Sequence, residues 1–105
     1  MANEVKAEVT LSCKVIKDKK IPYARVEREE SIIQLYADKP LEDAVYGAMI
    51  NLFSWIVEEY GVRPKDAYIM ISCIPDFRIK VYQIVKSPLH PYVVGAEIPK
   101  KYLKK

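Results

Sequence analysis

His90 is the residue of this chain best suited to acid–base chemistry, because it is the only histidine and an imidazole titrates near neutral pH. It lies in a stiff stretch between Pro88 and Pro91, where a lone histidine is more typical of a surface loop than of a catalytic centre. Both readings of His90 stay open. A structural zinc site takes four nitrogen or sulfur ligands at short spacings. We therefore expect no metal site and no cofactor-binding residue in this chain.

Asp76 is the second candidate catalytic residue. It follows a predicted helix and precedes a predicted strand, close to Ser72, and a carboxylate at such a junction can accept backbone N–H bonds. The alternative is an aspartate that only forms the turn. The acidic pairs at 29–30 and 58–59 are predicted to lie on solvated faces, because adjacent side chains on a strand or helix point in different directions.

Cys13 and Cys73 are the only cysteines, and they form no C-x-x-C motif. We expect both thiols to be reduced and buried, with a disulfide or zinc role as the alternative. The sequence contains no G-x-G-x-x-G, no phosphate-binding P-loop, no G-x-S-x-G and no H-E-x-x-H. The residues by themselves therefore indicate no particular reaction.

Composition narrows the class of protein. The 105 residues suit one domain spanning 1–105, and with half of them hydrophobic and 30% charged they suit a globular one. No apolar run has the length of a membrane span, and charged residues interrupt the first fourteen positions, so we expect a cytoplasmic protein. A net charge of +3 is too small to predict nucleic-acid binding, and the lysine-rich tail from Lys100 is read as a solvated terminus. Few glycines beside seven prolines favour a thermophilic source.

The first third of the chain predicts three antiparallel strands. Apolar residues occupy the odd positions from Val5 to Val15 and polar residues the even ones, which is the pattern of a strand with one buried face. A polar turn at 18–20 leads to a second strand at 21–26, which Pro22 should make start late or lie at an edge. A third strand is predicted at 31–36.

A long amphipathic helix is predicted from Leu41 to Tyr60, with Gly61 ending it. Its apolar stripe is widened by Phe53 and Trp55, which we take as candidate interface residues in a homo-oligomer. A shorter helix should begin at Pro64 and end before the Pro75-Asp76 pair. Strands follow from Phe77, with a bulge near Val81, and from Tyr92 to Ile98. The fold class is α+β, a mostly antiparallel sheet in the order βββααββ with both helices packed on one face.

The stretch 64–79, which reads PKDAYIMISCIPDFRI, resembles a signature near the C-terminus of the acetamidase/formamidase family. That signature has Asp-Ala-Tyr on a helix, an aliphatic run, a serine, and an aspartate that leads into a strand. The likeness continues through 83–85 and the closing Ile-Pro-Lys at 98–100, and includes the helix at 41–55, so that it covers about 39–103. Pro75 departs from the family, which usually has glycine there, and proline cannot adopt a turn with positive φ.

The resemblance implies a C-terminal domain or small subunit of an amidase for small linear amides such as formamide or acetamide. The family's longer N-terminal part has no counterpart here, so the resemblance implies that the catalytic centre lies on that N-terminal part or on a partner chain. It also implies that any divalent metal belongs to the complete enzyme rather than to this chain. We expect this chain to be inactive on amides by itself. Its expected partners are a second copy of itself or a larger N-terminal amidase chain. The alternative is a non-catalytic binding or assembly module that retains the fold, and nucleic-acid binding ranks well below both.

Overall fold

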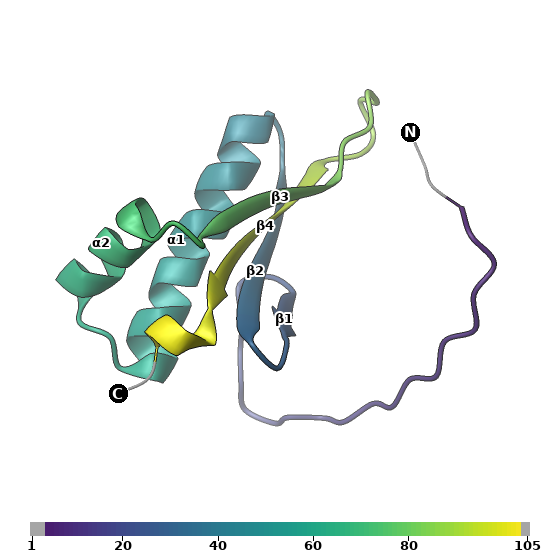
Figure 1. Cartoon of the computed structure of the whole chain (residues 1–105). Helices are drawn as coiled ribbons and strands as arrows, with labels where there is room; N and C mark the ends of the chain where they lie inside the picture. The colour runs from purple at the N-terminus through teal and green to yellow at the C-terminus, as the bar shows by residue number, and fades with distance from the viewer. Residues whose placement is uncertain (1–3, 104–105) are drawn as a thin grey trace.

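A computed structural model describes residues 4–103, which form a four-stranded sheet with two helices against one of its faces (Figure 1). The elements in chain order are β1 (Arg25–Glu27), β2 (Ser31–Asp38), α1 (Leu41–Tyr60), α2 (Pro64–Cys73), β3 (Arg78–Gln83), β4 (Tyr92–Pro99) and the 3-10 turn η1 (Lys100–Tyr102). The strand order is β1-β2-β4-β3, and every neighbouring pair is antiparallel. The predicted α+β class is therefore confirmed. Lys104 and Lys105, in the predicted basic tail, lie outside the described residues.

The helices form where the apolar periodicity predicts them. Helix α1 spans the predicted range and ends at Gly61, whose φ of 68° is the left-handed conformation that glycine adopts without strain. Proline opens α2, where its missing N–H leaves no hydrogen bond unmade. None of the helices in the part of the chain that the structure describes is long and apolar enough to cross a membrane.

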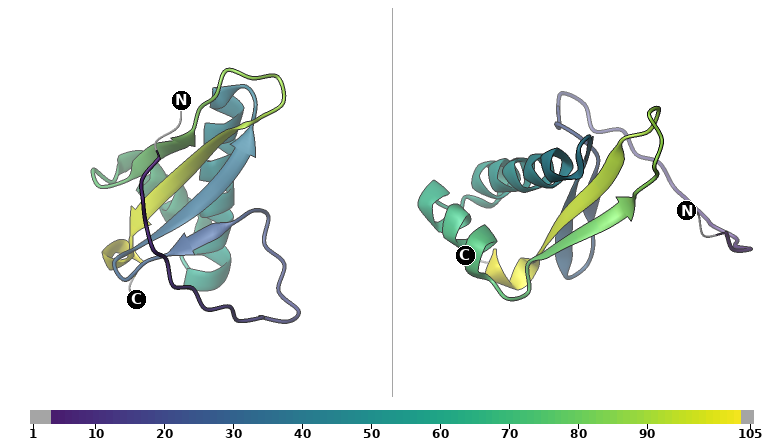
Figure 2. Two further views of the ribbon diagram at one scale, coloured as in Figure 1. Left: turned by 90° about the vertical axis from the view of Figure 1, so that its right-hand side faces the viewer. Right: turned by 90° about the horizontal axis from the view of Figure 1, so that it is seen from above.

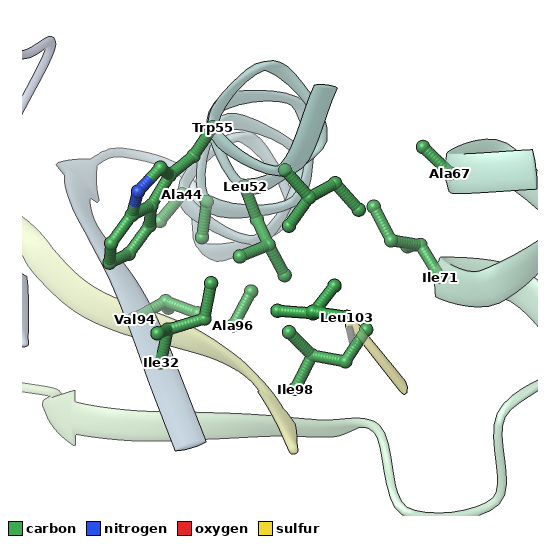
Figure 3. Packing of buried hydrophobic residues seen from close by; sticks show 12 residues of the cluster. Ile32, Ala44, Leu52, Trp55, Ala67, Ile71, Val94, Ala96, Ile98 and Leu103 are labelled. Atoms are coloured by element: carbon green, nitrogen blue, oxygen red, sulfur yellow. The ribbon is translucent and has the colours of Figure 1, made fainter. Parts of the chain in front are cut away.

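The core lies between α1 and the two central strands (Figure 3). Fully buried side chains of α1, among them Leu52, face Ile32 of β2 and Ile98 of β4. Ile71 of α2 and Leu103, just after η1, close the core at one end. Since α1 lies over the middle of the sheet, both edge strands are left less covered, as the view from above shows (Figure 2).

The predicted strand at 5–15 is wrong for this structure. The segment is extended but has no strand neighbour among residues 4–103, and its apolar side chains are exposed, with Val5 at 86% and Leu11 at 82%. Alternation of apolar and polar residues makes a strand only where a neighbouring strand supplies hydrogen-bond partners and a face to cover. Of the second strand predicted at 21–26, only Arg25 and Val26 lie in a strand, the three-residue β1, which starts after Pro22 and lies at a sheet edge, as the proline suggested.

Both cysteines are free and exposed, so the prediction of buried thiols is wrong. Cys13 lies on the apolar face of the segment 5–15, and it is exposed because no sheet covers that face. Cys73, the last residue of α2, lies on the side of that helix away from the core. The predicted irregularity near Val81 is confirmed, since the register of β3 against β4 shifts between Val81 and Gln83.

Candidate functional site

Asp76 lies in a four-residue turn between α2 and β3. The backbone N–H of Phe77 donates to the carbonyl of Ile74 at 3.2 Å and so closes the turn. Pro75 is the second residue of this turn, a position that requires the φ to which proline is restricted. The carboxylate of Asp76 accepts a hydrogen bond from Tyr102 Oη at 2.7 Å and lies 3.2 Å from Lys101 Nζ. The sequence suggested backbone N–H donors for this carboxylate, whereas the structure gives it side-chain partners from η1.

These partners control the charge of the Asp76 carboxylate. The Tyr102 hydroxyl and the Lys101 ammonium both favour the ionised form, so they lower the pKa of Asp76 below its ordinary value. The same hydrogen bond raises the pKa of Tyr102, because the phenol donates to a negative group. Asp76 is therefore ionised at neutral pH and cannot donate a proton there.

A charged hollow opens beside this turn, where the β1–β2 turn, the α2–β3 turn and the end of β4 meet. It consists of two adjoining depressions of about 440 and 610 Å³ that share the residues Glu29, Glu30, Asp76 and Pro99. The backbone N–H of Lys100 donates to the carbonyl of Glu30 at 2.8 Å and so holds two of these segments together. The whole lining comprises Arg28, Glu29, Glu30, Ser31, Asp76, Arg78, Glu97, Pro99, Lys100 and Lys101.

Glu97 is the most buried ionisable group of the charged hollow, with 10% of its side chain exposed. Its carboxylate accepts from Ser31 Oγ at 2.6 Å and forms ion pairs with Lys80 Nζ at 2.6 Å and Arg28 Nη1 at 3.4 Å. Burial alone would raise the pKa of Glu97, but the bonds from Lys80 and Ser31 outweigh it and lower that pKa. Sequence reasoning missed Glu97, although a single charge within the apolar run of β4 was a usable signal.

The hollow can bind, but its groups are poorly arranged to activate a nucleophile. Ser31 donates to the Glu97 carboxylate, yet a carboxylate with a lowered pKa is a weak base. Ser72 Oγ donates to the carbonyl of Tyr68 one turn earlier in α2, at 2.9 Å, and is engaged within its own helix. Fixed donors and acceptors side by side suit a small polar ligand that carries both kinds of group.

His90 lies far from the charged hollow. It is exposed in the connection between β3 and β4, with its Nδ1 atom 3.2 Å from Ser87 Oγ. Asp76 precedes β3 and His90 follows it, at opposite ends of a six-residue strand, which is roughly 20 Å long at about 3.3 Å per residue (Figure 1). The structure therefore does not bring the two candidate catalytic residues together.

The two candidate interface residues have different surroundings. Trp55 is buried within its own chain at 4% exposure, beneath the guanidinium of Arg25, whose carbon lies 4.4 Å from the ring centre. Its side chain therefore offers no free surface to a partner. Phe53 lines an apolar depression of about 280 Å³ between α1 and α2, together with Tyr46, Met49, Ile50, Tyr68, Ile71 and Ser72. That Phe53 faces a partner stays a prediction.

Among residues 4–103, no cluster of three or more histidine, cysteine, aspartate or glutamate side chains is arranged to hold a metal ion. Two carboxylates of the charged hollow, those of Glu97 and Asp76, are instead engaged by cations of the same chain.

The fold and the charged hollow define a small α+β domain with a helix-covered antiparallel sheet. No family model matches the sequence, and no curated protein matches it. Two solved structures share the fold. The acetamidase from Yersinia enterocolitica is similar over 86% of this chain, with a TM-score of 0.76 and 31% sequence identity. The acetamidase from Bacillus halodurans is similar over 82%, with a TM-score of 0.67 and 16% identity, which shows the fold alone.

The resemblance to acetamidases is therefore confirmed, and it concerns one portion of those enzymes. The chain spans only 26% of the Yersinia protein and 28% of the Bacillus protein. That coverage is consistent with the expected C-terminal portion.

Proposed function

We propose that this chain is the C-terminal domain or small subunit of an amidase that acts on small linear amides such as formamide and acetamide. One observation supports this above the others. The chain is 31% identical to a solved acetamidase, and the match covers 86% of this chain but only 26% of that enzyme. The remaining portion is then the expected location of the catalytic centre and of any divalent metal.

The chemistry of the described residues supports a chain that is inactive by itself. Amide hydrolysis needs an activated nucleophile or a metal-bound water, a proton donor for the leaving amine, and a group that polarises the carbonyl. Asp76 is held ionised by the Tyr102 hydroxyl and Lys101, and Glu97 by Lys80 and Ser31. His90 follows the far end of β3. We infer that the charged hollow contributes binding or positioning in the complete enzyme and that another chain or domain supplies the reacting groups.

The experiment is complementation of a split enzyme. The Yersinia acetamidase is expressed without the segment that this chain matches, and the missing segment is supplied in trans as this chain. Ammonia release from formamide and acetamide is measured for each part and for the pair, with the enzyme's own segment as the matched control. We expect no ammonia from this chain alone, with or without added zinc, and turnover from the pair.

Two results would contradict the proposal. Ammonia release by the pure chain that is lost in His90→Ala would show that the chain carries a complete site. If the enzyme's own segment restored ammonia release and this chain did not, the alternative of a non-catalytic binding or assembly module would be favoured. The cytoplasmic location, the thermophilic source and the expected homo-oligomer remain predictions.

A further inference from the structure

Helices α1 and α2 carry no charge over most of their length. Residues 44–57 of α1, and residues 67–75, which include the greater part of α2, contain no aspartate, glutamate, lysine, arginine or histidine. In the whole chain 30% of the residues are charged. A surface helix normally has charged residues opposite its core-facing stripe, whereas a helix that lacks them on every side is typical of one that is buried. The two sequences therefore indicate helices that are covered on two sides.

The described residues cover only one of these sides. One side of α1 packs on β2 and β4, whereas Tyr46 and Ile50, on its other side, are 68% and 44% exposed. Tyr68 of α2 is 70% exposed. These three residues line the apolar depression between the helices together with Met49 and Phe53, and the five are here called the helix face. Within residues 4–103 the helix face is open to water, which is unfavourable for large apolar side chains.

The size of the similar acetamidase indicates what could cover the helix face. The match takes in 86% of this chain but 26% of the Yersinia enzyme, so about three quarters of that enzyme lies outside it. A domain within a larger chain contacts the rest over roughly 600–1,500 Å², and permanent interfaces are more apolar than free surface. The helix face has that composition. The charged hollow does not, because its carboxylates at Glu97 and Asp76 are already paired within the chain.

Charges at the ends of the helices disfavour a lipid surface and a second copy as the occupant. The helices contain one basic residue, Lys65, and five acidic ones, namely Glu42, Asp43, Glu58, Glu59 and Asp66. Two of the five are paired with cations outside the helices, Lys19 and Arg63. Helices that lie on lipid have lysine and arginine beside the apolar face. In a two-fold pair the remaining acidic residues of both copies would border one interface and repel each other.

We propose that the helix face is the surface by which this chain docks on the remaining portion of an amidase, and that an uncharged, apolar part of that portion fills the depression at Phe53. The docking rests on the proposed function and adds the surface that it uses. Tyr46 and Tyr68 are the most exposed residues of the helix face and serve as its anchors. A tyrosine ring buries a large apolar area on docking, while its hydroxyl can find a hydrogen-bond partner.

A chimaera tests this docking: the Yersinia acetamidase with its matched segment replaced by this chain. The test variant combines Tyr46→Lys with Tyr68→Lys. The matched control is Leu89→Lys, at a position that is 84% exposed in the connection between β3 and β4. In the isolated chain all these positions are exposed, so each variant should melt within about 4 °C of the native chain. In the chimaera the test variant should lower Tm by roughly 5–10 °C, because it places two charges in a covered apolar surface. It should also reduce ammonia release from formamide, and the control should change neither quantity.

The outcomes separate this docking from the proposed function. A chimaera with the native chain that releases no ammonia would overturn both. An active chimaera that tolerates the test variant as well as Leu89→Lys would overturn the docking alone. The docking would also be wrong if the helix face proved to have another occupant. That result would be a dimer of the isolated chain in sedimentation velocity, or cosedimentation with phosphatidylcholine vesicles, that the test variant abolishes and the control does not.

Discussion

Gly47 lies in the middle of α1, where helix propensity and packing predict opposite effects for Gly47→Ala. On propensity alone, alanine in a helix interior is more stable than glycine by about 0.8–1.0 kcal/mol. In the structure, however, Gly47 is buried against the ring of Tyr36 on β2. A Cβ at this position would lie 2.8 Å from Tyr36 Cγ and closer still to two carbons at the ring edge.

We expect the steric clash to decide whether Gly47→Ala raises or lowers the free energy of unfolding. Tyr36 Cγ is attached directly to its own Cβ, so the ring cannot move aside as the end of a long side chain could. Overpacking of a core usually costs about 1–3 kcal/mol, and contact with three ring carbons puts this site near the upper end. After the gain in propensity, we expect Gly47→Ala to lower the free energy of unfolding by about 2 kcal/mol. In a domain of this size that lowers Tm by roughly 8–16 °C.

A double-mutant cycle measured by urea unfolding provides the control. In the Tyr36→Ala background the obstructing ring is gone, and Gly47→Ala should stabilise the chain by about 1 kcal/mol. The reversal of sign corresponds to a coupling of about 3 kcal/mol between the two positions. If Gly47→Ala raised the stability of the otherwise native chain, the packing of Tyr36 on α1 described above would be incorrect.

Three further outcomes follow from the structure. Because cations lower the pKa of Glu97 from its ordinary 4.5, its ionised form stabilises the fold above that pH and the effect is lost as pH falls through the folded pKa. Glu97→Gln should cost about 1–3 kcal/mol at neutral pH and nothing at acid pH, as urea titrations at several pH values would show. Gly61→Ala should cost about 1–2 kcal/mol, because φ there is 68°; an unchanged Tm would contradict this. Cys13 and Cys73 should both react with a maleimide in the native chain at the rate of free thiols.

Local pattern was sufficient for the elements that carry their own signal. The period of 3.6 residues along α1, and the proline and glycine at helix ends, act over a few neighbours in the chain and predict the same structure in most folds. The order of the later elements followed from them, including the bulge near Val81. The turn at Pro75 and Asp76 was likewise predictable, because proline restricts its own φ wherever it stands.

The charged hollow could not be predicted from the sequence, because its side chains meet only in the tertiary structure. Glu97 and Ser31 are 66 residues apart, and Asp76 and Tyr102 are 26 apart, so no local pattern could pair them. The pKa values of both carboxyls depend on those partners, and the separation of Asp76 from His90 depends on the direction in which β3 runs.

The segment 5–15 shows most directly what each level decides. Its sequence determines a side chain pattern with one apolar and one polar face, because residues two apart share a face in any extended chain. Whether that pattern becomes a strand depends on a neighbour, since an extended chain has no hydrogen bonds of its own. Within residues 4–103 the sheet places β1 and β3 at its edges and gives the segment no neighbour, so Cys13 and the valines beside it stay exposed.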